Sequence, residues 1–211
     1  MSPVDTTTGR VVKICCGPYD SLAYLLIVDC EALLIDAGPP ADTIQEALEK
    51  NGASLRYVLL THTHFDHLTG LRDLQMRLGV EALAHPEDIS ILEDMWPSHL
   101  GDPPEVRDLK GDVTLRSLRV NVMHTPGHTP GSVCYHMGAM KVLFTGDTLF
   151  AGNIGRTDLK LGNATRMKES LLKIMKLDPE TLVLPGHGEP TTIEAERRNL
   201  SIYLELLEEI G

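Results

Sequence analysis

The sequence predicts an α/β protein in which β-sheets are covered by helices. Three observations carry this prediction: short Val-, Ile- and Leu-rich segments follow one another as hairpins, segments with helical spacing lie between them, and the chain ends in helices. No low-complexity segment, charge run or Pro/Gly/Ser-rich linker divides the chain. We therefore expect a single domain over residues 1–211.

In the first half, strands are predicted where β-branched and apolar residues run together, and helices where apolar residues recur every three or four positions. Asp42 is placed to cap one helix, and Gly79 to end another. The predicted elements are strands over 11–15, 22–28, 32–35 and 57–60, a helix over 42–50, and a helix from the polar segment 61–66 to residue 78.

The second half continues with strands and closes with two helices. Asn163 is a candidate cap for the first of these helices, and Thr191 with Glu194 form a candidate capping box for the second. Residues 86–112 contain Trp96 and several prolines and are interpreted as a helix plus a loop over the site. The predicted elements are strands over 80–84, 115–123, 132–136, 141–144 and 181–184 and helices over 164–176 and 193–209.

Composition and charge exclude several classes of protein. Hydrophobic residues make up 42% and charged residues 23% of the chain, which is ordinary globular usage. The formal net charge of −11 repels phosphate backbones and anionic lipids, so we expect neither nucleic acid nor membrane as a partner. The polar first residues and the lack of a long apolar stretch lead us to expect a cytoplasmic protein. The four cysteines form no CxxC pair and are expected to be reduced, mostly buried thiols.

Four side chains that can ligate a metal lie within six residues, directly after the predicted strand 57–60. They are His62, His64, Asp66 and His67, in the segment THTHFDH. Imidazole and carboxylate are good ligands for zinc, iron and manganese, and such groups are costly to collect unless a cation orders them. The cluster therefore predicts a metal site.

Three further segments place a ligand-type residue beside Gly or Pro after an apolar run. They are HTPGHTPG with His128, FTGDT with Asp147 and LPGHG with His187. Glycines permit the tight turns that a metal centre between loops requires. Each segment alone is weak evidence for a metal site, but the four together, in the order HxHxDH, H, D, H, are specific evidence for one.

With these motifs, the sequence from about residue 22 to 187 resembles the metallo-β-lactamase-fold hydrolases, and most of all their short glyoxalase II-like group. The resemblance implies an αββα four-layer sandwich, with two mixed sheets flanked by helices and a metal site at one edge. It also implies two divalent metal ions, zinc before iron or manganese. Carried over motif by motif, the ligand residues are His62, His64 and His128 for one ion, Asp66, His67 and His187 for the other, and Asp147 as the bridge.

Asp36, in the segment LLIDAG, matches the acidic residue that supports the ligand loop from behind in this family. The remaining histidines are interpreted as structural or surface residues, because a lone His is commonly satisfied by ordinary hydrogen bonds. They are His85, His99, His124 and His136.

Two ions that share a water can present hydroxide at neutral pH, so a hydrolase follows. Asp66 would orient the attacking hydroxide, and no protein nucleophile is needed. A thiolate leaves without strong acid assistance, which makes a thioester such as S-lactoylglutathione, or a related hydroxyacyl thioester, the expected substrate.

The segment GDTLF followed by GR places Arg156 where glyoxalase II has a basic residue that binds glutathione, and an Arg fork suits a carboxylate. An ion pair with Asp158 is the equal alternative. The chain also departs from full-length glyoxalase II, because it ends about two dozen residues after His187 and has Gly188-Glu189 where that family has Glu and a substrate-binding Tyr.

Other readings stay open. A persulfide dioxygenase would use one iron at His62, His128 and Asp147, and a lactonase shares the TPGHTPG-like segment. A β-lactamase, a nuclease and a non-catalytic metal scaffold are less favoured, the last because seven ligands with carboxylates imply open coordination positions. The oligomeric state is left open, since the amphipathic last helix fits core packing.

Overall fold

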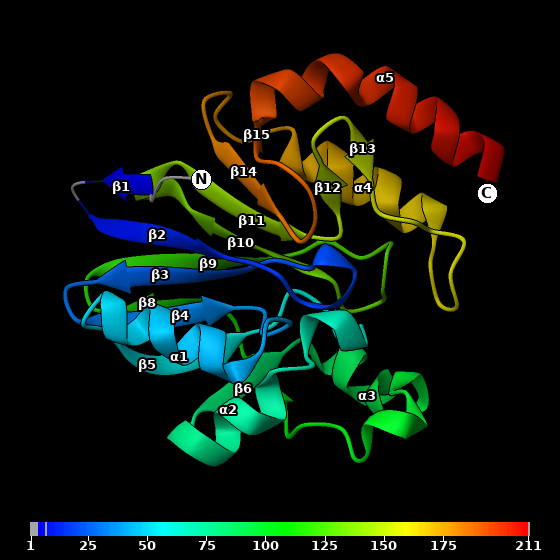
Figure 1. The fold of residues 1–211 in the computed structure, drawn as a ribbon. Coiled ribbons are helices and arrows are strands. Elements are labelled where there is room, and N and C mark those ends of the chain that lie inside the picture. Colours follow the sequence, from blue (N-terminus) through cyan, green and yellow to red (C-terminus); the bar gives the residue numbers. More distant parts are fainter. Residues whose placement is uncertain (1–3, 7, 211) are drawn as a thin grey trace.

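The computed structural model describes residues 4–6 and 8–210 and has four layers. Two mixed sheets pack face to face, with helices α1, α2 and α3 on the outer side of one and α4 and α5 on the outer side of the other (Figure 1). This is the αββα sandwich that the sequence predicted. The helices are α1 (Ala41–Lys50), α2 (Leu71–Leu78), α3 (Pro86–Met95), α4 (Ala164–Ile174) and α5 (Ile193–Ile210).

The first sheet has its strands in chain order from β1 to β7. Strands β1 to β4 pair antiparallel, as hairpins, while β4 to β7 pair parallel through helical crossovers. The strands are β1 (Val4–Thr6), β2 (Gly9–Ile14), β3 (Ala23–Val28), β4 (Glu31–Ile35), β5 (Ser54–Leu59), β6 (Glu81–Ala84) and β7 (Arg107–Asp108).

The second sheet has the order β15-β14-β11-β10-β9-β8, and a small hairpin, β12-β13, lies beside it. Only β11 and β14 pair parallel; the other neighbours are antiparallel. The strands are β8 (Val113–Leu115), β9 (Leu118–His124), β10 (Val133–Met137), β11 (Val142–Gly146), β12 (Leu149–Phe150), β13 (Asn153–Ile154), β14 (Leu182–Pro185) and β15 (Thr191–Thr192).

Three apolar clusters fill the spaces between the four layers. The central cluster joins the two sheets, and within it the rings of Tyr24 and Phe144 lie 5.2 Å apart. A second cluster seats α1 and α2 on the first sheet, and a third seats α4 and α5 on the other. Each sheet therefore buries both faces, which explains the nearly continuous apolar runs of β3 and β4.

Five loops that carry predicted site residues lie at one edge of the sandwich. Strands β4 and β5 run in the same direction, and so do β9, β11 and β14, so each group places its carboxyl ends together. The two sheets are joined at this edge: Leu22 N–H donates to Gly186 O and Val133 N–H donates to Thr61 O, both at 2.8 Å. These links bring residues distant in sequence into one site.

Two predicted helix caps are wrong. Pro40 precedes the first turn of α1, and Asp42 makes an ion pair with Arg77 of α2 instead of capping its own helix. At α5, Thr192 rather than Thr191 is the cap, because its Oγ1 accepts from Ala195 N–H at 3.2 Å. The predicted Asn163 cap of α4 is confirmed by a bond from Arg166 N–H at 2.8 Å.

The predicted helix from residues 61–66 to 78 is interrupted. A short 3₁₀ turn, Phe65–His67, is followed by a break, and α2 begins only at Leu71. The break arises because His67 O accepts from Ala37 N–H and Gly70 N–H donates to Ala37 O, so the backbone bonds to the β4–α1 loop instead of continuing the helix. Gly79 ends α2 in the left-handed conformation, as predicted.

The predicted strand 115–123 is a hairpin, β8–β9, that turns at Arg116, whose φ is +54°. The expectation of mostly buried thiols is also wrong: all four cysteines are free, but only Cys134 is buried. Cysteines 15, 16 and 30 lie in or beside loops, where no packed layer covers them. Over residues 4–6 and 8–210, no helix has both the length and the apolar character to cross a bilayer.

Candidate metal centre and substrate pocket

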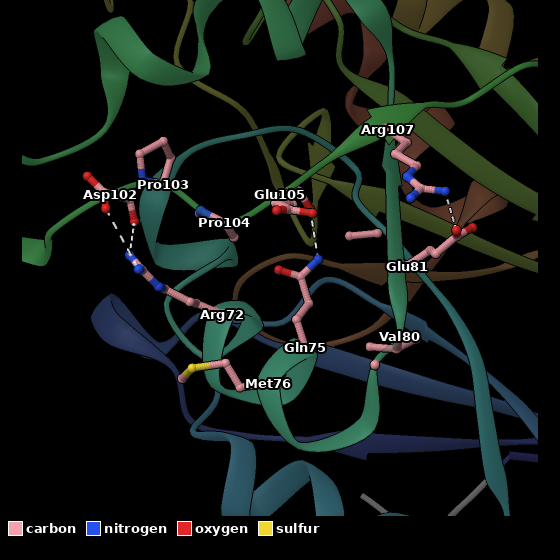
Figure 2. A pocket seen from close by; sticks show the side chains of 12 residues that line it. Arg72, Gln75, Met76, Val80, Glu81, Asp102, Pro103, Pro104, Glu105 and Arg107 are labelled. Atoms are coloured by element: carbon pink, nitrogen blue, oxygen red, sulfur yellow. Dashed lines mark hydrogen bonds and ion pairs between the residues drawn. The ribbon is translucent and has the colours of Figure 1, made fainter.

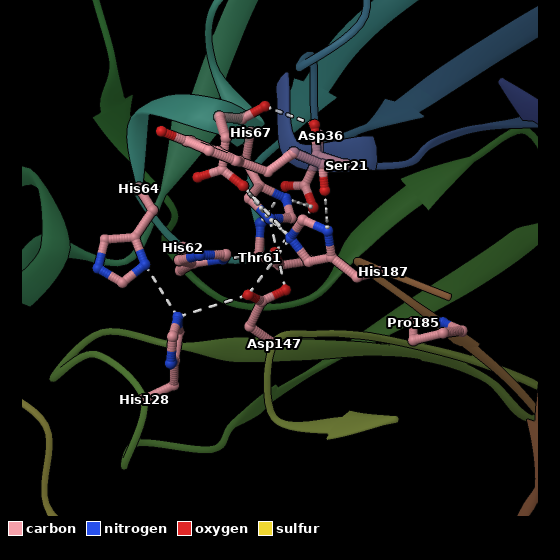
Figure 3. Close-up of polar contacts among 12 residues, drawn as sticks. Ser21, Asp36, Thr61, His62, His64, His67, His128, Asp147, Pro185 and His187 are labelled. Atoms are coloured by element: carbon pink, nitrogen blue, oxygen red, sulfur yellow. Dashed lines mark hydrogen bonds and ion pairs between the residues drawn. The ribbon is translucent and has the colours of Figure 1, made fainter. Parts of the chain in front are cut away.

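The seven predicted ligand residues converge at the edge described above (Figure 3). They form three groups whose ligand atoms lie within 4.8 Å of one another: His62 with His64 and His128, His62 with His67 and Asp147, and Asp66 with His67 and His187. His64 Nδ1 is 2.9 Å from His128 Nε2, and His67 Nε2 is 3.2 Å from His187 Nε2. The first and third groups match the two ligand sets that the sequence predicted.

Asp147 lies between these two groups and faces both. Its Oδ1 is 3.4 Å from His67 Nε2, and its Oδ2 is 3.5 Å from His128 Nε2. Asp66 faces one group only, with Oδ2 at 3.2 Å from His187 Nε2. Asp147 is thus the carboxylate whose geometry suits a bridge, and Asp66 the one that suits a terminal ligand.

The second ring nitrogen of each buried imidazole has a partner that fixes its orientation. His67 Nδ1 is 3.0 Å from Asp36 Oδ2, and His62 Nδ1 is 3.1 Å from Thr61 Oγ1, which itself donates to Asp36 at 2.8 Å. Backbone carbonyls do the same for two other rings: Arg156 O for His128 at 2.9 Å and Tyr19 O for His187 at 3.1 Å. Each arrangement leaves a nitrogen aimed at the centre, as in ligating histidines.

Two glycines allow the loops to approach. A Cβ on Gly146, whose φ is +48°, would stand 2.3 Å from Thr61 Oγ1. A Cβ on Gly186 would stand 2.4 Å from Asp147 Oδ1 and 2.7 Å from His67 Cε1. A larger residue at Gly146 would displace Thr61, and one at Gly186 would displace the Asp147 carboxylate and the His67 ring.

The donor set fits a divalent cation. His62 Nε2 and Asp147 Oδ1 are buried without a hydrogen-bond partner, a costly arrangement that a cation would relieve. Burial first, and neighbouring imidazoles second, lower the pKa of His62 well below its ordinary value and that of His64 to about 4. Both rings are therefore neutral at pH 7, which is the form that binds metal.

Burial by itself raises the pKa of Asp147, but the surrounding imidazoles, led by His67, lower it below its ordinary range. The carboxylate is therefore charged. This ionised carboxylate and the neutral rings of His62 and His64 are donors of the kind that bind a divalent ion.

Asp88, in the first turn of α3, is a site residue that the sequence analysis missed. It is fully buried and accepts hydrogen bonds from Thr63 N–H at 2.9 Å, Gly131 N–H at 2.6 Å and Thr129 Oγ1 at 2.9 Å. It thereby joins the loop of His62 and His64 to the loop of His128. An acidic residue in a first helical turn is common, so no sequence signal distinguished Asp88 from an exposed one.

A cavity of about 680 Å³ opens onto the candidate centre and includes His64, Asp66, His128, Asp147 and His187 in its wall. Arg156 also lines it, as expected, but its guanidinium donates to both oxygens of Asp158 at 2.9 and 2.8 Å. The predicted loop over the site is present, since Met95, the last residue of α3, and Pro97, just after the helix, line the same cavity. The rest of the wall is Tyr19, Phe65, Phe150, Asn153, Ile154 and Leu159.

A second cavity, of about 610 Å³, lies between α2 and residues 102–107 (Figure 2). Its polar groups bond to one another: Arg72 to Asp102 O at 2.9 Å, Gln75 to Glu105 O at 2.7 Å, and Arg107 to Glu81. None of the candidate ligands lines it. It offers paired side chains and no reactive group.

His85, Glu87 and His124 also lie within 4.8 Å of one another. The two rings stack at 4.1 Å and 12°, so their in-plane lone pairs run side by side instead of meeting at one point. Glu87 pairs with Arg166, His85 caps α3, and His124 is 2.9 Å from Pro130 O. This geometry fits the structural role expected for both histidines.

Sequence comparison finds relatives over most of the chain. An uncharacterized protein of Mycobacterium leprae is 39% identical over 80% of this chain and 85% of its own length. The probable metallo-hydrolase YqgX of Bacillus subtilis is 32% identical over 86% and 91%, and the hydroxyacylglutathione hydrolase GloC of Haemophilus influenzae is 32% identical over 80% and 85%.

Solved structures share the fold. The B3 metallo-beta-lactamase BLEG-1 has a TM-score of 0.80 and 32% identity and covers 92% of this chain and 99% of its own. TTHA1623 in a di-iron-bound form has a TM-score of 0.79 and 32% identity, with 89% and 97% covered. ETHE1 from Myxococcus xanthus has a TM-score of 0.74 and 27% identity, with 95% and 91% covered.

The model of the metallo-beta-lactamase superfamily matches residues 16–187, the span that holds all the candidate ligands. Together with the four-layer fold and the His/Asp clusters, this match shows that the chain belongs to the metallo-beta-lactamase superfamily.

Proposed function

We propose that the protein is a metal-dependent thioester hydrolase that works with two divalent ions, zinc before iron or manganese. One observation carries the proposal: the Asp147 carboxylate lies beside both ligand groups, with Oδ1 at 3.4 Å from His67 Nε2 and Oδ2 at 3.5 Å from His128 Nε2 and 3.6 Å from His187 Nε2. The assigned ligands are His62, His64 and His128 for one ion and Asp66, His67 and His187 for the other, with Asp147 between them. The hydrolase names of two relatives and the di-iron form of a third support this assignment.

When bound, a pair of divalent ions would supply a hydroxide nucleophile at neutral pH and polarise the substrate carbonyl. The chain's own residues would then orient the nucleophile and hold the imidazole rings in place. Asp66 lines the cavity, where its carboxylate would accept a hydrogen bond from the attacking hydroxide. This hydrogen bond would direct the lone pair of the hydroxide at the carbonyl carbon. Asp36 and the carbonyls of Arg156 and Tyr19 keep the imidazoles from rotating.

The bond cleaved is the carbonyl carbon–sulfur bond. The hydroxide oxygen would join the carbonyl carbon and the thiolate would leave. The proton that the new carboxylic acid releases is taken up by the thiolate through solvent water, so the products are a carboxylate and a thiol. A thiolate needs little acid assistance, which fits a cavity wall whose acids, Asp66 and Asp147, are assigned to the ions. We further propose a reducing, cytoplasmic setting, which the four free cysteines support, and no nucleic acid or membrane partner.

The test is hydrolysis of S-lactoylglutathione and of uncharged acyl thioesters by zinc-loaded, iron-loaded and chelator-treated protein, followed by loss of thioester absorbance. Metal-dependent turnover of any thioester supports the proposal. No turnover of any thioester in either metal form would overturn it.

Two other activities are measured alongside. Oxygen uptake by the iron form with a persulfide would favour a dioxygenase that uses His62, His128 and Asp147. Opening of a lactone or of a β-lactam would favour those ring-opening activities, and the similarity to BLEG-1 is the observation that brings the β-lactam into the test.

A further inference from the structure

The cavity wall facing the candidate centre is mainly apolar. Tyr19, Phe65, Met95, Pro97, Phe150 and Ile154 all line it. The whole chain has only three phenylalanines and 4% aromatic residues, yet two of the three phenylalanines are in this wall. Such concentration of scarce aromatic side chains around a reactive centre is typical of a site that binds an apolar group.

The aromatic residues are fixed to the ligands themselves. Tyr19 offers its carbonyl to His187 Nδ1 at 3.1 Å, and its ring meets the ring of Phe65 edge to face at 5.8 Å. Phe65 lies between two ligand residues in sequence, and the ring of Phe150 is 6.2 Å from that of His187. The apolar wall therefore has a set position relative to the reacting atoms.

Tyr19 is also exposed in a way that folding alone does not explain. Its side chain is 78% exposed, and its backbone adopts a φ of +53°, which is uncommon for a non-glycine residue. A large aromatic ring held in this conformation at the mouth of a cavity can contact a bound molecule that enters it.

The charges of the cavity wall do not favour a substrate whose thiol or acyl part carries negative charge. Arg156 is the one Lys or Arg side chain among the lining residues, and both oxygens of Asp158 occupy it. This contact lowers the pKa of Asp158 and keeps it ionised, so the pair has no net charge. A glutathione thioester carries two carboxylates, and the described wall offers neither of them an unpaired cation.

Building on the thioester hydrolase proposed above, we infer that the cavity selects thioesters whose body is uncharged and apolar, and that Asp158 enforces this choice by occupying Arg156. The substrate class is an aliphatic or aromatic acyl group on a small neutral thiol. The hydrolysis step is the one already written, with no oxidant or further reactant.

The experiment uses the zinc-loaded full chain and four thioesters, made from two acyl groups, acetyl and hexanoyl, and two thiols, neutral N-acetylcysteamine and glutathione. We expect kcat/KM for hexanoyl-N-acetylcysteamine to exceed that of the acetyl ester by about 10-fold or more, because each methylene that enters an apolar cavity adds selectivity. We also expect it to exceed the value for hexanoylglutathione.

The outcomes separate this inference from the proposed function. Equal or better use of the glutathione thioesters, or no effect of acyl chain length, would overturn the inference and leave the hydrolase standing. Hydrolysis of none of the four would overturn the inference, and the hydrolase would fall with it if S-lactoylglutathione also shows no turnover in either metal form.

Three variants test the roles that the inference gives to Asp158 and to the apolar wall. Asp158→Asn frees the guanidinium, and the ratio of kcat/KM for hexanoylglutathione to that for the neutral ester should rise about fivefold, the scale of an exposed ion pair. Phe150→Ala should reduce the advantage of hexanoyl over acetyl, and bound zinc is measured as a check on the site. Met95→Gln, at the end of α3, repeats the test should Phe150→Ala lose zinc. An unchanged chain-length preference in a zinc-loaded variant would contradict the inference.

Discussion

The side chains of Asp36 and Asp88, beneath the candidate metal centre, are buried and hydrogen-bonded, whereas most side chains of the facing cavity wall are partly exposed. Asp36 and Asp88 have almost no exposed surface and together accept bonds from Thr61, Thr63, Thr129 and Gly131. By contrast, the side chains of Tyr19 and Arg156 extend into solvent.

This difference in burial corresponds to two roles, holding the metal ligands in place and contacting the substrate. The ligand side chains must keep a fixed geometry, and buried charge-assisted hydrogen bonds provide it because any displacement leaves a buried polar group unpaired. The wall has only to present a surface, so it tolerates side chains with few partners. Changes beneath the centre should therefore affect metal binding and folding, and changes in the wall should affect substrate choice.

The largest effect is expected for Asp147→Ala. It removes the carboxylate shared by both ligand groups, so activity should fall by more than the roughly 100-fold typical of losing an outer-shell partner, and bound metal should decrease. Metal analysis and thioester hydrolysis check this. Asp158→Ala, which removes the carboxylate paired with Arg156, serves as the control and should keep its metal. A fully metallated, active Asp147→Ala protein would contradict the bridging role.

Asp36→Ala should weaken metal binding by roughly 10- to 100-fold, because His67 and Thr61 lose the carboxylate that orients them. Competition with a chromophoric chelator measures the affinity. Asp29→Ala, which removes an exposed carboxylate in the β3–β4 turn, provides the comparison. Equal affinities in the two variants would show that Asp36 does not position the ligands.

Asp88→Asn should lower the free energy of unfolding by about 2 kcal/mol. Both carboxylate oxygens accept a backbone N–H, from Thr63 and from Gly131, so either orientation of an amide would set its NH₂ group against a donor. Urea unfolding at saturating metal measures the change, with Glu87→Gln as the neighbouring exposed control. An Asp88→Asn protein as stable as that control would refute the role of Asp88 in joining the two loops.

The last prediction is a pH dependence of the stability of the chelated protein. The pKa of His64 is lowered to about 4 and that of His62 is lowered well below 6.5, so between pH 6.5 and 4 the unfolded chain binds protons that the folded chain does not. Stability should therefore fall as the pH falls through this window, by up to about 1.4 kcal/mol per pH unit for each such residue.

His67 acts in the opposite direction. Although burial lowers its pKa, Asp147 and Asp36 raise it above 6.5, so its contribution is fully present below pH 6.5 and is lost as the pH rises above that value. Between pH 4.5 and 6.5 the His67 contribution is constant, so urea unfolding in this window reports the slope that His62 and His64 produce. His64→Asn should flatten the slope, whereas His99→Asn, at an exposed position, should not; identical slopes in both variants would contradict the assignment.

Local patterns predicted most elements, because apolar periodicity reports which residues face a packed layer. They failed where a distant segment competes for the same groups. Asp42 pairs with Arg77 of another helix, and the chain after His67 bonds to Ala37 instead of closing a helical turn. The turn at Arg116 was missed because its positive φ is held without the glycine or asparagine that usually marks such a turn.

The sequence by itself predicted sheets covered by helices and, through its family resemblance, the four-layer class. It also predicted the candidate ligands, because His62, His64, Asp66 and His67 lie within six residues and the other candidates follow apolar strands beside glycine. Only the tertiary structure decided which carboxylate faces both ligand groups, that Asp88 joins two loops, and that Asp158 occupies Arg156. The physical reason is that a residue's type fixes which bonds it can make, whereas the packing of the two sheets fixes which partners lie within reach.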